Sequence, residues 1–215
     1  SILQGNDFHQ VVTVNPEFTL LAEKDTSFRE ALLSSDNRFA DGIGITLAGF
    51  TQGRVVDRFP GADLLEVILK MCEERNLSVF LVIRKDGLSS FGEVKKKLLK
   101  KYPALEVSGV ECDASSQEVS EELFSHNVVL CNFGAPGQEI FLSKLKNIDS
   151  QVKLAMGVGG SFDYITGKRP RAPKILRKIG LEWLWRLILQ PSRVGRIWNA
   201  VVIFPLHLLF TTVKK

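Results

Sequence analysis

The sequence predicts an α/β fold: a Rossmann-like, mostly parallel sheet with helices on both faces, followed by a basic amphipathic helical appendage. Short apolar runs alternate with amphipathic segments over the first three quarters of the chain, as in βαβ units. Glycine-rich or Asn-Pro turns follow several of the runs directly. The pattern changes after Pro173, so we expect a core over residues 1–172 and an appendage over 173–215.

The first elements are predicted from start signals. Residues 11–14 form an apolar strand, and Asn15-Pro16-Glu17 then starts a helix that we expect to reach about Leu33. Asn15 can cap that helix, Pro16 suits its first turn, and Glu17 favours the positive helix end. A turn at 41–44 precedes a short apolar stretch.

The remaining core elements alternate by type. Helices are predicted at 61–74, 89–101, 116–124 and from the 134–139 turn to about 146, and strands at 79–83, 105–110, 127–133 and 152–158. In parallel sheets ligands bind beyond the carboxyl ends of the strands. The turns after 14, 133 and 156 are therefore the candidate site.

The tail combines apolar, basic and tryptophan residues. Apolar residues between 175 and 188 recur at helical spacing, and residues 197–213 are apolar but broken by Asn199, Pro205 and His207. We expect a helix lying in a membrane interface. A helix packed on the core and a spanning helix are the alternatives, although the run is shorter than the ~20 residues that a span needs.

Charge is divided unevenly along the chain. Residues 1–150 hold 16 basic and 22 acidic residues, whereas residues 151–215 hold 12 basic and 2 acidic residues. This asymmetry predicts a polyanionic partner, such as a lipid head group, a diphosphate or a nucleic acid. No zinc-finger, RNP-like or homeodomain pattern is present, so we expect no nucleic acid as partner.

The cysteines and the start of the chain carry less information. Cys72, Cys112 and Cys131 have neither metal-binding nor redox spacing, which favours a reducing compartment over a disulfide scaffold. The chain begins at Ser1 without a methionine, so we expect a further N-terminal element. The apolar tail also allows a homo-oligomer.

Six motifs, in order along nearly the whole chain, resemble the WecG/TagA/CpsF family of bacterial glycosyltransferases. They are Thr13-Val14-Asn15-Pro16-Glu17, Ala40-Asp41-Gly42-Ile43-Gly44, Arg58-Phe59-Pro60-Gly61-Ala62-Asp63, Phe133-Gly134-Ala135-Pro136-Gly137-Gln138-Glu139, Met156-Gly157-Val158-Gly159-Gly160-Ser161-Phe162-Asp163, and Arg171-Ala172-Pro173 with Gly180-Leu181-Glu182-Trp183.

The resemblance implies an inverting transferase without a catalytic metal or other cofactor. It would move an N-acetylmannosamine-type sugar from a UDP-sugar to N-acetylglucosaminyl-diphospho-undecaprenol, in cell-surface polysaccharide or teichoic acid synthesis. Such an enzyme would be peripheral, on the cytoplasmic face of the bacterial membrane, and contact its anionic surface. Residues 84–87 and 110–113 depart from the family pattern. The alternatives are therefore a different UDP-hexose donor and a non-catalytic membrane-docking relative.

Asp41 is the candidate catalytic base. Inverting transfer needs a group that takes the acceptor's hydroxyl proton, and a carboxylate in a glycine turn suits this role. The resemblance implies the same position. The alternative is an aspartate that only caps its turn.

Further residues are predicted to bind substrate. Without a metal, N–H groups and arginines must stabilise the leaving diphosphate. Each of these positions also has a purely structural interpretation. The glycine turn at 157–160 could be a plain turn, Asn15 could be a helix cap, and Glu139 could be a helix-start residue. Arg58 could be an ion-pair partner of Asp57 or Asp63, and the tail arginines could form a solvated face. Phe162 replaces the last glycine of a dinucleotide fingerprint, which disfavours a dehydrogenase. The predicted binding residues are Thr13, Asn15, Arg58, Asp63, Gln138, Gly157, Gly159, Gly160, Arg171, Arg186, Arg193 and Arg196.

Overall fold

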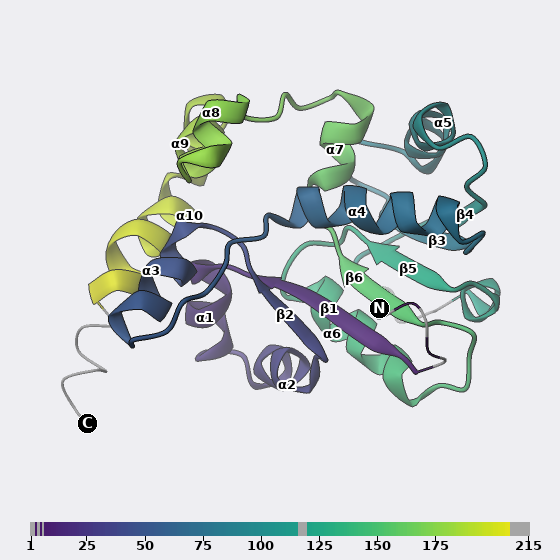
Figure 1. The fold of residues 1–215 in the computed structure, drawn as a ribbon, viewed down its shortest axis with the longest axis horizontal. Coiled ribbons are helices and arrows are strands. Elements are labelled where there is room, and N and C mark those ends of the chain that lie inside the picture. The colour runs from purple at the N-terminus through teal and green to yellow at the C-terminus, as the bar shows by residue number, and fades with distance from the viewer. Residues whose placement is uncertain (1–2, 4, 6, 116–119, 207–215) are drawn as a thin grey trace. The chain divides into compact units, whose positions relative to one another are not determined.

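The computed structural model describes all residues except 1–2, 4, 6, 116–119 and 207–215 (Figure 1). The chain divides into two compact units. The first, which we call the sheet unit, comprises Ser1–Val12, Ser27–Arg38 and Gly61–Pro170. The second, the tail unit, comprises Thr13–Thr26, Phe39–Pro60 and Arg171–Lys215. The tail therefore belongs to one unit with two segments from the first third of the chain, and a domain boundary near residue 172 stays a prediction.

One six-stranded parallel sheet in the order β2-β1-β6-β5-β3-β4 confirms the predicted Rossmann-like class. β5 pairs with β6 from Val128 opposite Leu154 to Cys131 opposite Gly157, so the turns that follow these two strands are neighbours. The strands are β1 His9–Val14, β2 Asn37–Ala40, β3 Val79–Arg84, β4 Val107–Cys112, β5 Val128–Cys131 and β6 Leu154–Gly157.

β2 was not expected from the sequence. Its four residues include only two apolar ones, Phe39 and Ala40, so no apolar run marks it. Its pairing depends on the neighbouring strand, and such tertiary context overrides local propensity. β1, β2 and α2 cross the boundary between the two units.

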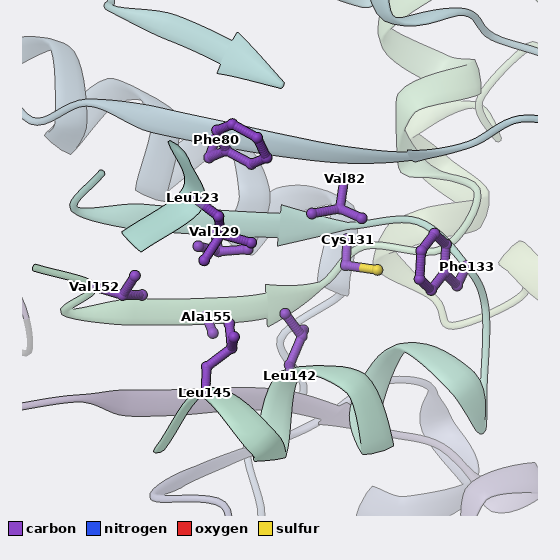
Figure 2. Packing of buried hydrophobic residues seen from close by; sticks show 10 residues of the cluster. All are labelled: Phe80, Val82, Leu123, Val129, Cys131, Phe133, Leu142, Leu145, Val152 and Ala155. Carbon is purple, nitrogen blue, oxygen red and sulfur yellow. The ribbon is translucent and has the colours of Figure 1, made fainter. Parts of the chain in front are cut away.

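The core of the sheet unit is apolar on both faces of the sheet. Every residue of β5 and β6 is buried, as expected for parallel strands covered by helices on both sides. Figure 2 shows Leu142 and Leu145 pointing toward Val129 and Ala155 of the sheet. This cluster fixes the helix that follows β5 against the strands.

The helices of the sheet unit largely follow their sequence signals. At the predicted 89–101 helix, Ser90 and Glu93 form a capping box. The helix predicted at 116–124 is instead the short 3-10 turn η1, and residues 116–119 lie outside the described part. The helical elements are α2 Thr26–Ser34, α4 Gly61–Glu74, α5 Phe91–Lys101, η1 Glu121–Ser125, α6 Gly137–Ser143, η2 Lys144–Asn147 and α7 Ser161–Thr166.

The tail unit is helical. Its elements are α1 Pro16–Ala22, α3 Ile43–Thr51, α8 Lys174–Lys178, α9 Glu182–Leu189, η3 Pro191–Arg193, α10 Val194–Trp198 and η4 Asn199–Ile203. The single helix expected from Pro16 to Leu33 is wrong: α1 ends at Ala22, where the N–H groups of Lys24 and Asp25 turn back to the carbonyl of Leu21. The apolar stretch after residue 44 is the helix α3.

Gly180 divides the helical pattern of the tail. Its φ of 81° is a left-handed conformation that ends α8 before α9 begins. A side chain at this position would also meet Ile43 of α3, whose Cδ1 lies 2.9 Å from where a Cβ would be. Over residues 7–115 and 120–206, no helix has the length and apolar character needed to cross a bilayer.

Candidate functional site

A cavity of about 390 Å³ lies within the tail unit. α1, α3, α9, α10 and the turn after β2 contribute its walls, which are mostly apolar. Its polar lining consists of one amide, three carboxylates and three guanidinium groups. They belong to Asn15, Glu17, Asp41, Arg58, Glu182, Arg186 and Arg196. Five of the predicted site residues therefore surround one cavity.

Asp41 is held by the main chain. It directly follows β2, and its N–H donates to the carbonyl of Val14 at 2.7 Å. Gly42, with a φ of 95°, then turns the chain into α3. The Asp41 side chain is half-buried at the cavity wall. The carboxylate thus sits where a ligand in the cavity could reach it.

Asn15 is the N-cap of α1, as its position before Pro16 predicted. Its Oδ1 accepts from the Phe18 N–H at 3.1 Å. The residue also lines the cavity, so capping and ligand contact are compatible. Ligand binding by Asn15 stays a prediction.

Arg58 lies beside the turn that carries Asp41. A parallel bridge joins Arg58 to Ala40, and the Phe59 N–H donates to the Ala40 carbonyl at 2.8 Å. The Arg58 guanidinium donates to the main-chain carbonyl of Arg177. This contact fixes the guanidinium between the β2 turn and α8.

Two cavity arginines are paired with acids. Arg186 Nη2 lies 2.7 Å from Glu182 Oε1, one turn earlier on α9. Arg196 contacts Glu17 through two N–O pairs of 2.7 and 2.8 Å. An anionic ligand would have to compete with Glu17 and Glu182 for these guanidinium groups.

Thr13 and Arg171 of the tail unit are not among the residues that line the cavity. Thr13 is half-buried on β1, and Arg171 is half-buried just before α8. The side chain of Arg193 lies outside the described part of the structure. Ligand binding by these three residues stays a prediction.

In the sheet unit, Gln138 joins the turns after β5 and β6. Its Oε1 accepts from the N–H of Gly134 at 3.0 Å and from the N–H of Gly159 at 3.1 Å. Its Nε2 donates to Glu139 Oε1 at 2.6 Å. The side chain is buried, with 4% exposed. The Gly159 N–H, which the sequence offered to a phosphate, is thus engaged by Gln138.

Gly157 is fixed by the same contact. A Cβ at this position would lie 2.3 Å from Gln138 Nε2 and 2.8 Å from Glu139 Oε1. Only glycine lets β6 approach α6 this closely. The requirement for glycine here therefore has a packing cause, and phosphate binding by Gly157, Gly159 and Gly160 stays a prediction.

Glu139 is a buried carboxyl group that sequence reasoning did not place in the site. Only 2% of the residue is exposed, and burial raises the pKa of Glu139 to about 7, while its hydrogen bonds lower it less. Its Oε2 has no hydrogen-bond partner among the described residues. The available signal was an acid between a buried glutamine and the apolar Ile140-Phe141.

Arg169 is a second residue that the sequence did not single out. Its Nη1 lies 3.5 Å from Asp163 Oδ2 and 3.7 Å from where a Cβ of Gly160 would be. Ser89 Oγ donates to Asp163 at 2.8 Å, so Asp163 holds this guanidinium beside the glycine turn. Arg169 stands in a run of basic residues, and nothing in that run distinguishes it.

The remaining candidates and the thiols have simple placements. Asp63 lies in the first turn of α4, in the sheet unit. Cys72, Cys112 and Cys131 are free thiols. Within the described residues, His, Cys, Asp and Glu side chains form no group of three that could hold a metal ion.

The chain matches a model of a known protein family. The model of the glycosyl transferase WecG/TagA/CpsF family matches residues 1–215, which is the whole chain. The six motifs of the sequence lie within this match, and the parallel sheet with its helical C-terminal region agrees with it. The chain therefore belongs to the WecG/TagA/CpsF family of glycosyl transferases.

Proposed function

We propose that this protein transfers an N-acetylmannosamine-type sugar from a UDP-sugar to N-acetylglucosaminyl-diphospho-undecaprenol, with inversion at the anomeric carbon. Family membership supports a glycosyl transferase. The observation that carries the finer proposal is the cavity of the tail unit, which Asp41 and three arginines line. A base and several fixed cations are what a metal-independent sugar transfer requires.

Asp41 acts as the base in this proposal. The acceptor hydroxyl oxygen attacks C1 of the donor sugar on the face opposite the UDP group. A new C1–O bond forms as the C1–O bond to UDP breaks, and the hydroxyl proton passes to Asp41. The half-buried position of Asp41 at the cavity wall supports this role.

Arginines balance the charge of phosphate groups. The departing UDP carries the electron pair of the broken bond, and guanidinium groups bind phosphate oxygens through paired N–H donors. Arg58, Arg186 and Arg196 are the candidates, because each lines the cavity. Asn15 would contact the sugar or the acceptor from the start of α1.

The tail unit also supports contact with an anionic membrane surface. Among the described residues, nine of the eighteen exposed large apolar side chains lie between Ile175 and Leu206, including Ile188 at 64% and Trp198 at 58%. Basic residues accompany them along the same segment. Such a surface suits an enzyme whose acceptor is anchored in a bilayer.

The test is a donor screen. The full chain is offered several UDP-sugars together with a lipid-diphosphate-N-acetylglucosamine analogue, and UDP release is followed. We expect release with UDP-N-acetylmannosamine, dependent on the acceptor. Turnover with another UDP-hexose alone would correct the donor, and no turnover with any donor would favour a non-catalytic relative.

A further inference from the structure

We propose that Glu139 is a positioning residue that acts through Gln138 to hold the turns after β5 and β6 in register. The consequence for donor binding rests on the proposed function and on the predicted contact of Gly157, Gly159 and Gly160 with the donor's diphosphate. The positioning itself rests on the sheet unit alone.

Gln138 has a fixed orientation. A glutamine amide has an accepting and a donating end, and two main-chain N–H groups bind its Oε1. Nε2 must therefore face the other way, where Glu139 Oε1 accepts from it at 2.6 Å. Without Glu139 Oε1, the buried Nε2 of Gln138 would lose its hydrogen-bond acceptor, and this contact would no longer set the direction of the amide.

The main chain of Glu139 has a fixed position. α6 begins at Gly137, and its apolar residue Leu142 packs on the sheet. Gln10 of β1 donates from Nε2 to the main-chain carbonyl of Glu139 at 3.0 Å. Gly157 leaves space for the Gln138–Glu139 pair on the side of β6. The main chain of Glu139 is thus fixed by α6 and β1, and its carboxyl group lies against Gly157 of β6.

The carboxyl group of Glu139 changes its charge near neutral pH. A pKa of about 7 makes Glu139 mostly uncharged in mildly acidic solution and mostly ionised above pH 8. Cys131 of β5 interacts with it electrostatically, but burial raises the pKa of that thiol well above neutrality. His9 of β1 interacts with Asp36, and the residues of β6 do not titrate. No basic side chain of the described residues contributes to the pKa of Glu139.

An uncharged Glu139 suits a diphosphate at these turns better than an ionised one. Its Oε1 accepts from Gln138 in both states, but ionisation places an uncompensated charge behind turns that would bind a dianionic diphosphate. Glu139→Gln keeps an accepting oxygen at every pH and carries no charge. Glu139→Leu removes the acceptor. Glu121→Gln changes an exposed acid of the same unit and is the matched control.

The first measurement needs no activity. Amide hydrogen exchange at Gly134 and Gly159 is followed by NMR in the full chain. We expect exchange at both amides to accelerate about tenfold or more in Glu139→Leu, and to stay near wild type in Glu139→Gln and Glu121→Gln. Unchanged exchange at both amides in a folded Glu139→Leu would overturn the positioning role.

The second measurement uses whichever UDP-sugar turns over in the donor screen. The diphosphate of this donor does not titrate between pH 6 and 8.5. Dividing kcat/KM of Glu139→Gln by kcat/KM of the wild type at each pH cancels the titration of groups that both proteins share. We expect the ratio of kcat/KM for the donor to rise about fivefold over this range, mainly through KM. A ratio that does not change with pH would overturn the role of the charge. This result does not depend on whether Glu139→Leu folds. Absence of turnover with every donor would count against the proposed function, whereas the exchange result would still decide the positioning.

Discussion

Arg196 of α10 and Glu17 of α1 form a two-point ion pair, with Nε 2.7 Å from Oε1 and Nη2 2.8 Å from Oε2. The residues are 179 positions apart in the chain, and both line the cavity of the tail unit. About half of the arginine side chain is exposed, so the pair contributes at most about 1 kcal/mol to stability. Its importance lies in where it holds the guanidinium: Arg196 is kept at the cavity wall before any anion arrives.

Replacing Arg196 tests whether this guanidinium binds phosphate. We expect Arg196→Ala to raise the KM of a phosphate-bearing substrate about tenfold or more, because a charge-assisted contact with the phosphate is lost. The Tm should be nearly unchanged, because the ion pair with Glu17 is exposed. Arg196→Lys should recover only part of the loss, since lysine cannot make the paired contact. Arg54→Ala, an exposed change of the same unit, is the control. Equal KM values for all four proteins would remove Arg196 from the site.

Gly157→Ala tests the packing of β6 against α6. The new methyl group would lie 2.3 Å from Gln138 Nε2 in a fully buried place, and such overpacking costs about 1–3 kcal/mol. Gly92→Ala in α5 is the matched control, because a Cβ there meets no atom within 4 Å. We expect it to be neutral or to stabilise by up to about 1 kcal/mol. Urea denaturation of both variants measures this difference in stability. Similar midpoints for Gly157→Ala and Gly92→Ala would show that the Gly157 contact is not tight.

The pH dependence of unfolding tests the burial of Glu139. Burial raises the pKa of this group from 4.5 to about 7, so the folded state keeps a proton that the unfolded state loses in this interval. Below pH 4.5 the titration of Glu139 does not change the free energy of unfolding. As the pH rises from 4.5 to about 7, the free energy of unfolding falls by about 3 kcal/mol in total. Glu139→Gln lacks this term, so its free energy of unfolding relative to wild type should increase from pH 4.5 to 8. A constant difference would show that Glu139 titrates normally.

The sequence predicted the sheet unit well where local signals and burial agree. The apolar runs that became β3, β5 and β6 were identified, and Asn15-Pro16 gave the start of α1. The break after Ala22 and the strand at 37–40 were missed, because neither has an apolar pattern or a strong turn residue of its own. The strand depends on pairing with β1, a contact distant in sequence that local propensity does not encode. The break after Ala22 is made by local hydrogen bonds to the Leu21 carbonyl, and no glycine or proline marks it.

The candidate site was also predicted only in part from the sequence. Asp41, Arg58, Arg186 and Arg196 were chosen by residue type, and the structure brings them to one cavity. The Gln138 amide contacts Gly159, 21 positions away, and its side chain is buried, which sequence spacing did not indicate. Ligand binding by Gln138 stays a prediction. Glu139 was assigned only to the start of its helix, because an acid at this place is usually explained by the helix dipole. Its burial comes from the sheet, which sequence spacing alone does not show.

Membrane contact can be tested by flotation with anionic vesicles. We expect the full chain to float, and the double variant Ile188→Glu/Trp198→Glu to float several-fold less, because both exposed apolar side chains would carry charge that the bilayer interface repels. Val67→Glu, an exposed apolar position of α4 in the sheet unit, is the control. Wild-type chain that stays with the soluble fraction would contradict membrane contact through the tail.

The role of Asp41 is tested most directly by sugar transfer in Asp41→Asn, compared with Asp57→Asn, an exposed acid of the same unit. With the UDP-sugar that turns over and a lipid-diphosphate acceptor analogue, we expect kcat to fall 10²- to 10⁴-fold in Asp41→Asn. UDP-sugar binding should stay within a few-fold of wild type, and Asp57→Asn should behave as wild type. A kcat in Asp41→Asn close to that of wild type would contradict catalysis by this carboxylate.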